Sequence, residues 1–466
     1  MPYSHINNIF EKLNCSGIPY CHFKSNANLD ISFAGNTDFD LLVDKKFITK
    51  FKSLLYKLGF KQRYTTFDKN YVCMEDYLYY DDELEKIHHF HIHYDLFFGK
   101  KLKKNIFLNI DFQKFIIKDE DFPIIIIQPE IELILLVLRT IFKFDLFNRI
   151  NILIHRQFSL SESIIREFDY LLNTIDQDKM EDILDEHFNS IQFFIKEFTI
   201  AYLSKNITMF FLLKLQYVIS KNCGQELFFV KSRNYNALYG IKKKSKRFST
   251  NWLESGGKTI AFIGVDGSGK SSTVEAINKF LSYKLTVKTL YLGKVTNYKT
   301  TLLNLASAIL SKLKFQKLSQ LMRGLVFTYI ANRKRKIFIE SKNNKGIGII
   351  SLFDRYPFKE FYAMNDPMDC PKLNKNDIKY FRRKELELFN DIDSYPDLII
   401  ILDIDLETSL RRKKEHIYIK PRLKEKIKAI QKLKSISIYK NLYIVDATQG
   451  QNLVLAEIKR IIWENL

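Results

Sequence analysis

A glycine-rich segment in the second half of the chain constrains the fold more than any other feature. Residues 264–271 read Gly-Val-Asp-Gly-Ser-Gly-Lys-Ser and match the pattern GxxxxGK[ST]. An apolar run precedes the segment, and Val274, Ile277 and Leu281 follow it at the spacing of one helix face. The pattern is informative in this context, because a phosphate-binding loop (P-loop) connects a strand to a helix.

The residue types in this loop suit a nucleotide triphosphate. Glycines let successive backbone N–H groups turn toward phosphate oxygens, and the helix N-terminus adds partial positive charge. We expect Lys270 to reach the β and γ phosphates of ATP and the Ser271 hydroxyl to ligate Mg²⁺. The predicted nucleotide-binding residues are Gly264, Asp266, Gly267, Ser268, Gly269, Lys270, Ser271 and Ser272.

The pattern after residue 258 alternates between strands and helices. We predict strands at 259–264, 288–292, 348–353, 398–403 and 442–445, and helices at 271–282, 302–340, 377–391 and the C-terminus. Such alternation specifies a parallel, doubly wound α/β sheet of the P-loop kinase type.

Three motifs in this half resemble those of thymidylate kinases, in the same order. Residues 262–273 (FIGVDGSGKSST) are similar to that family's phosphate loop, and residues 354–356 (DRY) resemble its DR[YH] element. Residues 396–405 (PDLIIILDID), followed by 410–414 (LRRKK), are similar to the run before the lid. The resemblance covers about residues 258–466 and implies an ATP- and Mg²⁺-dependent kinase.

The resemblance also implies roles for individual residues. Asp354 would hold Mg²⁺ or orient the acceptor phosphate, and Arg355 would clamp that phosphate. Arg411 or Arg412 would bring positive charge from the lid to the transferring group. With Lys270, these four residues form the predicted catalytic set, because phosphoryl transfer depends on positioning and on neutralising negative charge.

The sequence leaves the acceptor open. Residues 357–364 replace the segment that helps thymidylate kinases hold thymine, and residues 368–373 (MDCPKL) resemble thymidylate-kinase-like proteins associated with bacterial surface-polysaccharide loci. The partner is therefore a small-molecule phosphate acceptor: a nucleoside monophosphate, with dTMP as the candidate, or a sugar or glycan hydroxyl. A nucleotide-gated regulator without an acceptor is the third interpretation.

A second candidate site lies near the N-terminus. Asp38 and Asp40 flank Phe39 in a strand pattern, so both carboxylates project from one face and could bind divalent metal and a triphosphate. Asp95 offers a third carboxylate, and Ser25 precedes Asp38. The alternative is a surface strand with exposed aspartates.

Residues 18–100 resemble nucleotidyltransferases of the polymerase-β type, with Lys24-Ser25-Asn26 in place of the usual Gly-Gly or Gly-Ser. The resemblance makes Asp38, Asp40 and Asp95 metal ligands in an α+β domain, and the chain potentially bifunctional.

Three histidines alternate with Asp95 along the same stretch, at positions 89, 91 and 93. Collinear positions on one strand reach successive neighbours rather than one ion, so a transition-metal site is the less favoured interpretation. We expect phosphate contact or half-buried packing instead, with His91 and His93 bordering the carboxylate site.

These patterns divide the chain into four parts. A nucleotidyltransferase-like α+β domain occupies 1–120, a helical extension 121–233, a basic linker 234–257 and the kinase-like domain 258–466. The linker contains the run Lys-Lys-Lys-Ser-Lys-Arg at 242–247.

Composition and charge limit the expected partners and the expected cellular compartment. The net charge is +20, but the lysines are dispersed, which is typical of a solvated surface, and nucleic acid is not an expected partner. Five cysteines without a CxxC pair indicate neither disulfides nor a zinc site. We expect no signal peptide and no membrane span, hence a cytoplasmic protein, and leave a homodimer open.

Overall fold

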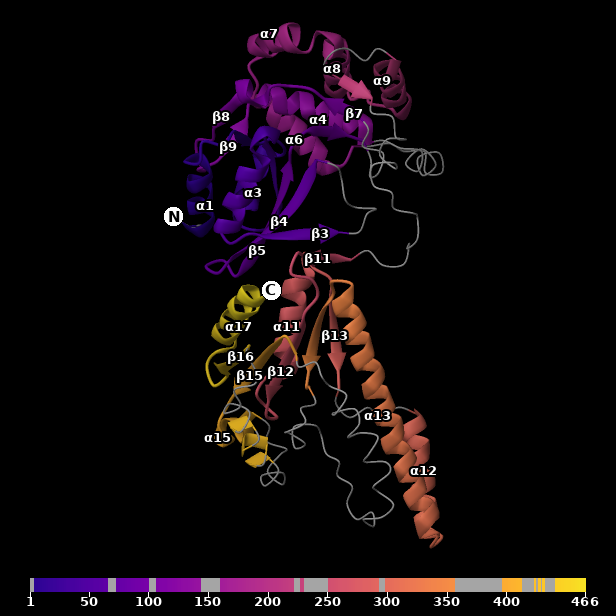
Figure 1. Ribbon diagram of the computed structural model, residues 1–466. Coiled ribbons are helices and arrows are strands. Elements are labelled where there is room, and N and C mark those ends of the chain that lie inside the picture. The colour runs from indigo at the N-terminus through magenta and orange to yellow at the C-terminus, as the bar shows by residue number, and fades with distance from the viewer. Residues whose placement is uncertain are drawn as a thin grey trace. The chain divides into compact units, whose positions relative to one another are not determined.

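The computed structural model divides into two compact units, Met1–Ser249 and Thr250–Leu466 (Figure 1). It describes residues 4–65, 73–99, 106–143, 160–221, 227–229, 250–292, 298–356, 396–412, 423–424, 426–428, 430–431 and 441–466. Much of the predicted linker and the segments 357–364, 368–373 and 377–391 therefore lie outside the described residues.

A mixed sheet organises the first unit. Its strands run in the order β3-β4-β5-β2-β1-β9-β8. They are β1 (Tyr20–His22), β2 (Phe39–Val43), β3 (Lys61–Thr65), β4 (Met74–Asp81), β5 (Lys86–His93), β8 (Ile116–Lys118) and β9 (Ile125–Ile127). β2 lies parallel to β5 and antiparallel to β1, while β4 lies antiparallel to β5. This register puts Asp40 beside His91.

Three helices accompany the strands of this sheet: α1 (Ser4–Asn14), α2 (Leu29–Phe33) and α3 (Ile48–Lys57). The connections also contain the short 3₁₀ turns η1 (Asn26–Asn28), η2 (Lys45–Phe47) and η4 (Phe112–Phe115). The buried side chains of α1 recur at helical spacing: Ile6, Ile9, Phe10 and Leu13. The ring of Phe10 lies 5.0 Å from that of Phe39 and 5.8 Å from that of Phe90, which ties the helix to β2 and β5.

A helical layer follows in the chain. It consists of α4 (Pro129–Lys143), α6 (Glu162–Thr174), α7 (Gln177–His187), α8 (Asn189–Leu203) and α9 (Met209–Lys221). α4 is buried almost all round because it contacts the other four helices and β6 (Leu96–Phe98). The stretch 121–233 also contains strands: besides β9, β10 (Leu227–Phe229) forms a small sheet with β7 (Ile106–Leu108) and β6 (Leu96–Phe98).

The second unit contains the parallel sheet that the sequence predicts. Its five strands are ordered β13-β14-β12-β15-β16, and every pair is parallel. Its strands and the helices next to them in the chain are β12 (Thr259–Gly264), α11 (Lys270–Ser282), β13 (Val287–Tyr291), β14 (Ile350–Asp354), β15 (Leu398–Asp403), α15 (Leu406–Arg412), β16 (Leu442–Asp446) and α17 (Gln451–Asn465). The central strands β12 and β14 are buried along their whole length, so both faces are covered. β11 (Asn251–Leu253) begins the unit.

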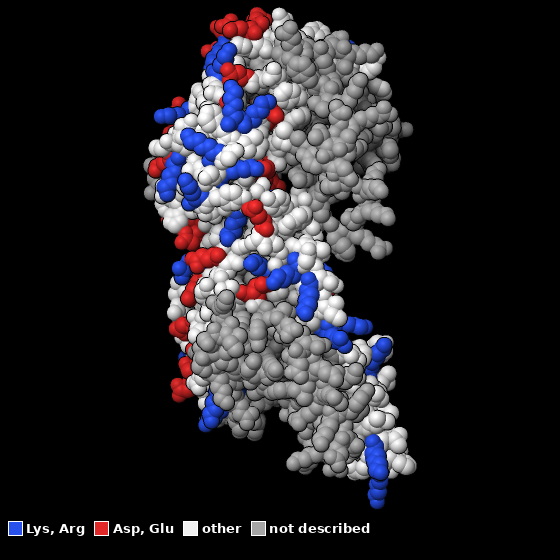
Figure 2. All heavy atoms as spheres, viewed as in Figure 1, with Lys and Arg blue, Asp and Glu red and all other residues white. Residues whose placement is uncertain are grey.

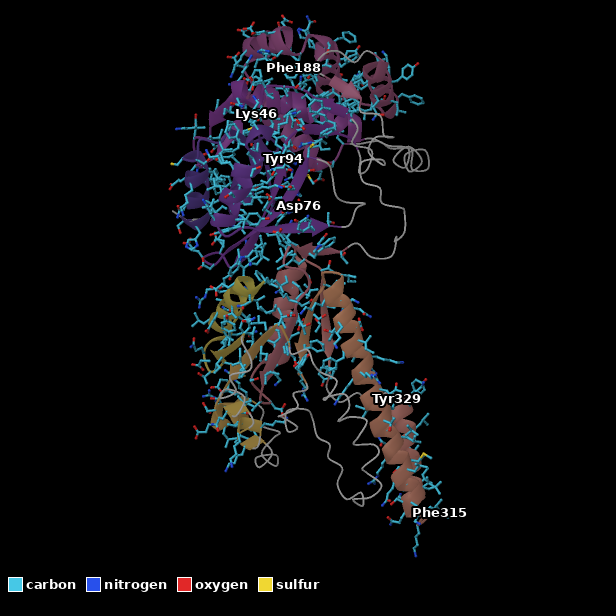
Figure 3. All side chains as sticks on the ribbon, viewed as in Figure 1. Lys46, Asp76, Tyr94, Phe188, Phe315 and Tyr329 are labelled. Atoms are coloured by element: carbon cyan, nitrogen blue, oxygen red, sulfur yellow. The ribbon has the colours of Figure 1, made fainter. Side chains whose placement is uncertain are left out.

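One predicted element of the second unit is wrong. The expected helix at 302–340 is two helices, α12 (Tyr298–Lys312) and α13 (Gln316–Gly346), which form a hairpin. Lys314 adopts a left-handed φ of 61° between them, and Phe315 lies at the tip (Figure 3). Large apolar side chains are exposed along the hairpin, among them Leu302, Leu305 and Leu321.

Charged side chains of both signs occur on the described surface. On the face drawn in Figure 2, lysines and arginines are spread over both units with acidic side chains among them. Among the described residues, no helix combines the length and apolar character that crossing a membrane requires.

Candidate functional site

A cavity of about 490 Å³ lies in the first unit, where the residues after β1 meet β2, β6 and helices α4 and α6. Its lining combines aromatic and aliphatic side chains with two cation–carboxylate pairs. Nζ of Lys24 lies 2.8 Å from Oδ2 of Asp40, and Nη2 of Arg139 lies 2.7 Å from both carboxylate oxygens of Glu167. Such a lining suits a partly apolar ligand that carries charged groups.

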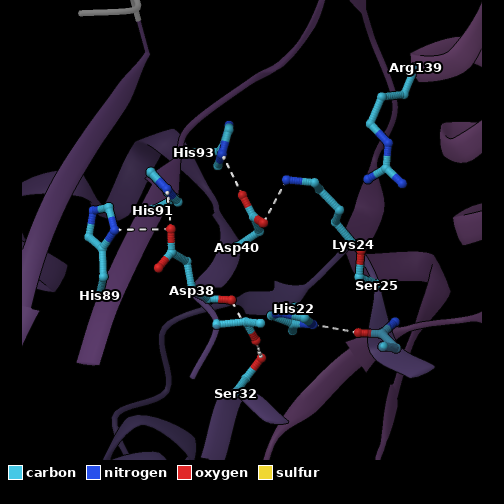
Figure 4. A network of polar contacts seen from close by, with 12 residues as sticks. His22, Lys24, Ser25, Ser32, Asp38, Asp40, His89, His91, His93 and Arg139 are labelled. Atoms are coloured by element: carbon cyan, nitrogen blue, oxygen red, sulfur yellow. Dashed lines mark hydrogen bonds and ion pairs between the residues drawn. The ribbon is translucent and has the colours of Figure 1, made fainter. Parts of the chain in front are cut away.

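Asp40 is ionised within this lining. Burial raises the pKa of its carboxyl, but the charge of Lys24 and the contact with His93 outweigh burial, and the pKa lies well below its ordinary value. Figure 4 shows Lys24 and His93 against different oxygens of the Asp40 carboxylate.

The turn Lys24-Ser25-Asn26 is held by glutamates from two helices. The backbone N–H and side-chain amide of Asn26 donate to Glu132 at 2.9 Å and 2.7 Å. The Ser25 hydroxyl donates to Glu167 at 3.2 Å. Burial raises the pKa of Glu132 to about 7. The sequence signal for Glu132 was weak: it is one charge in a largely apolar helix that also contains Glu130 and Arg139.

The structure does not bring Asp95 to the other two predicted metal ligands. β5 ends at His93 and the chain bends, so the alternation of side chains does not continue to Asp95. Its Oδ1 instead lies 3.3 Å from Nζ of Lys45. The strand expected to carry the three histidines and Asp95 thus ends at His93, and the next strand, β6, lies in a different sheet.

Asp38 contacts histidines rather than a carboxylate partner. Its Oδ2 lies 3.1 Å from Nδ1 of His89 and 3.1 Å from Nε2 of His91 (Figure 4). His93 lines the cavity and lies 3.4 Å from Asp40. His91 and His93 thus border the two aspartates, as expected, and His89 joins them.

In the second unit, the P-loop requires glycine at three positions, because there is no room for a Cβ or because φ is positive. A Cβ on Gly264 would lie 2.4 Å from Oγ of Ser268 and 2.9 Å from the carbonyl oxygen of Leu402. Gly267 and Gly269 have φ of 86° and 88°, a region that other residues rarely adopt. The loop therefore folds tightly between the end of β12 and the first residue of α11.

Lys270 is buried at the base of this loop. Its ammonium donates to the carbonyl of Val265 at 2.8 Å. Burial lowers the pKa of Lys270 to about 8, against the opposing effect of Asp266. Of the predicted serines, Ser268 is buried in the loop, whereas Ser272 is exposed on α11.

Ser271 and Asp354 meet across neighbouring strands. β14 pairs with β12, with Asp354 opposite Phe262, so Asp354 ends its strand beside the loop. The Ser271 hydroxyl donates to Oδ2 of Asp354 at 2.6 Å. Oδ1 of Asp354 is buried and has no hydrogen-bond partner among the described residues. A hydroxyl and a carboxylate with an unused oxygen fit Mg²⁺, which prefers oxygen ligands.

Asp266 gathers two cations at the same loop. Its Oδ2 accepts from Nζ of Lys426 at 2.9 Å, and its Oδ1 lies 3.9 Å from Nη2 of Arg355. Burial alone would raise the pKa of Asp266, but the hydrogen bond and charge of Lys426 lower it to about 2. Arg355 has a φ of 97° and lies over the ring of Tyr291.

Comparisons with known proteins agree with this geometry. The chain is 26% identical over 211 residues to the thymidylate kinase of Thermosipho melanesiensis, covering 44% of this chain and 96% of that protein. It is 28% identical over 182 residues to the uncharacterised ATP-binding protein YghS of Escherichia coli, covering 34% and 74%. The chain contains a distant thymidylate-kinase-like P-loop domain.

Other comparisons are weaker. The structure of deoxyadenosine kinase from M. mycoides with bound dATP matches at 17% identity over 44% of this chain and 98% of that chain, with a TM-score of 0.27. No protein-family model matches the chain. The first unit remains unidentified by these comparisons.

The two predicted lid cations, Arg411 and Arg412, are the last residues of α15. Arg412 donates to the carbonyls of Ala447 and Thr448, and Arg411 is exposed at the end of α15. Lys426, which sequence reasoning missed, is a second buried cation at the loop besides Lys270, with 5% exposure. It lies among several lysines without a distinguishing neighbour, so its contact with Asp266, 160 residues away, had no sequence signal.

Proposed function

We propose that the second unit is an ATP- and Mg²⁺-dependent kinase that phosphorylates a nucleoside monophosphate, with dTMP as the first candidate. The observation that carries the proposal is the contact between Ser271 and Asp354, since it joins the P-loop to the neighbouring strand end where a metal-bound triphosphate would lie. The similarity to thymidylate kinases supports the substrate class.

In the proposed reaction, an oxygen of the acceptor phosphate attacks the γ-phosphorus of ATP, and the bond to the β–γ bridging oxygen breaks to release ADP. Lys270 and the loop N–H groups hold the β and γ phosphates in line with the acceptor. Ser271 and Asp354 would hold Mg²⁺, which neutralises charge on the triphosphate when bound.

The charges around the loop favour a phosphorylated acceptor over a neutral sugar. Lys270, Arg355 and Lys426 line one small concavity with Asp266. Asp354 lies beside it, so three cations stand against two carboxylates. Arg355 would release Asp266 and pair with the acceptor phosphate, for which its forked guanidinium is suited. A sugar or glycan hydroxyl remains the alternative acceptor, and a nucleotide-gated regulator the alternative to a kinase.

The proposal does not extend to nucleotidyl transfer by the first unit. Asp95, the third metal ligand predicted there, pairs with Lys45 and is not grouped with Asp38 and Asp40. The proposed activity therefore rests on the second unit.

Formation of ADP from ATP with Mg²⁺ tests the proposal, with dTMP, other nucleoside monophosphates and a panel of sugars as acceptors. We expect turnover that depends on dTMP and is lost in Lys270→Ala. Arg355→Ala should raise KM for the acceptor more than KM for ATP, because its guanidinium would bind the acceptor phosphate.

Lys279→Ala is the matched control, since Lys279 is exposed on the same helix as Lys270. Selective turnover with a sugar would move the protein to glycan chemistry. Tight ATP binding without turnover on any acceptor would favour the regulator.

A further inference from the structure

A cluster of metal-ligating side chains lies on three adjacent strands of the first unit. Asp38 immediately precedes β2, His89 and His91 lie on β5, and Asp76 lies on β4 directly opposite His91. In Figure 4 the imidazoles of His89 and His91 both approach one oxygen of Asp38. The candidate ligand atoms of Asp38, His89 and His91 lie within 4.8 Å of one another.

The separations match those of ligands around one ion. Oδ2 of Asp38 is 3.1 Å from Nδ1 of His89 and 3.1 Å from Nε2 of His91. Nitrogen and oxygen ligands about 2.0–2.1 Å from a tetrahedral ion lie about 3.3 Å from each other. His89 and His91 can therefore reach one ion, because the third ligand, Asp38, comes from the neighbouring strand rather than from β5 itself.

The opposite ring nitrogens are positioned by a carboxylate. Oδ1 of Asp76 lies 3.2 Å from Nε2 of His89 and 2.7 Å from Nδ1 of His91. Oδ2 of Asp76 accepts from Nη2 of Arg63 at 2.7 Å. Metal-binding histidines commonly present their second nitrogen to a carboxylate, which fixes the ring and its tautomer.

One ligand atom is almost fully buried. His89 is 2% exposed, and its Nδ1 faces Oδ2 of Asp38 at 3.1 Å, a separation that two ligands of one metal ion would also have. The Asp38 and His91 side chains are 28% and 22% exposed, which gives an ion access from solvent.

We infer that Asp38, His89 and His91 bind one divalent transition-metal ion of the Zn²⁺ type, with Asp76 as the positioning residue behind both histidines. The two imidazoles favour such an ion over Mg²⁺ or Ca²⁺. Three protein ligands leave a fourth coordination position for water or an oxygen of a ligand. This site is separate from the P-loop and does not depend on the proposed kinase activity.

The test uses the full chain, freed of metal with a chelator and titrated with Zn²⁺ and with Co²⁺ in excess Mg²⁺. We expect one equivalent to bind, with the visible absorption of tetrahedral Co²⁺. Asp38→Asn and His91→Asn should each weaken binding more than tenfold, and Asp76→Asn should weaken it about tenfold by releasing the rings.

His5→Ala is the control, because His5, Asp81 and Asp82 form the other group of potential ligands among the described residues. Circular dichroism checks the fold of each variant. If His91→Asn does not fold, the metal affinity of Asp38→Asn alone decides the test. The inference is overturned if the folded wild-type chain binds no stoichiometric metal. It is equally overturned if His5→Ala abolishes binding while Asp38→Asn and His91→Asn preserve it.

Discussion

Asp266 is the residue of the P-loop whose environment depends most on distant parts of the chain. Its carboxylate contacts Lys426 and approaches Arg355, while its backbone carbonyl accepts from the Ser409 hydroxyl at 2.6 Å. These contacts hold the loop against α15 and the segment that contains Lys426. Phosphate groups would compete with Asp266 for Lys426 and Arg355. The strength with which Asp266 holds these two cations therefore also sets how readily the site binds phosphate.

Replacing Lys426 should impair both stability and turnover. Lys426→Ala leaves Asp266 without its hydrogen-bonded cation, and we expect a loss of about 1–3 kcal/mol in the free energy of unfolding and at least about a tenfold loss in kcat/KM for ATP. Urea unfolding and steady-state kinetics measure the two effects. Lys428→Ala, on the exposed side of the same segment, should change neither; equal behaviour of both variants would refute the assignment.

Glu132 should make the stability of the first unit depend on pH. Its pKa is about 7 in the folded protein against 4.5 ordinarily, so the folded chain holds an extra proton between these values. Stability therefore falls as pH rises through this window, by up to about 3 kcal/mol at about 1.4 kcal/mol per pH unit of pKa shift.

The side chain in Glu132→Gln cannot ionise, so the free energy of unfolding of this variant should vary less with pH. The substitution can also change that free energy by a constant amount at every pH. The measurement is the difference in unfolding free energy between pH 5 and pH 8 for both proteins. An identical difference in wild type and variant would contradict the assigned ionisation.

At the scale of single residues, the sequence predicts what a local motif encodes. The loop glycines, Lys270 and Ser271 follow from one strand-loop-helix pattern, and Asp354 from its place at a strand end. Asp76, Glu132 and Lys426 could not be found in this way, since each acts through a partner that is distant in sequence. The placement of Asp95 with the aspartate pair was wrong because β5 ends before it.

Among the elements, the α12–α13 hairpin shows where periodicity misleads. Apolar spacing continues across residues 313–315, which contain neither glycine nor proline, so the sequence reads as one helix. The turn is supported instead by buried contacts between the helices. The Ser307 and Ser319 hydroxyls each donate to the other residue's carbonyl, at 3.0 Å and 2.8 Å. Small side chains there allow the two helices to approach closely.

The turn residue itself offers a test. Lys314 has a φ of 61°, which costs about 1–2 kcal/mol for a residue with a Cβ, so Lys314→Gly should stabilise the protein by about 0.5–1 kcal/mol. Lys336→Gly, at an exposed position inside α13, should instead destabilise it by about 1 kcal/mol. Chemical denaturation distinguishes the two, and a loss of stability in Lys314→Gly would argue against the hairpin turn.

For the whole molecule, the two units differ in how far their sequences predict them. The parallel sheet of the second unit follows from alternating strands and helices, each signalled locally. The mixed sheet of the first unit depends on pairings such as β2 with β5, which join residues about 50 positions apart and leave no local pattern. Its cavity likewise arises only when the residues after β1, β6, α4 and α6 come together.

The central claim is phosphoryl transfer at the P-loop, and the most direct measurement follows the γ-phosphate of labelled ATP into dTMP. The account predicts labelled dTDP from the wild-type chain, at least about a hundredfold less from Lys270→Ala, and unchanged formation from Lys279→Ala. Absence of label in any nucleoside diphosphate product, with dTMP and the other nucleoside monophosphates present and ATP bound, would contradict it.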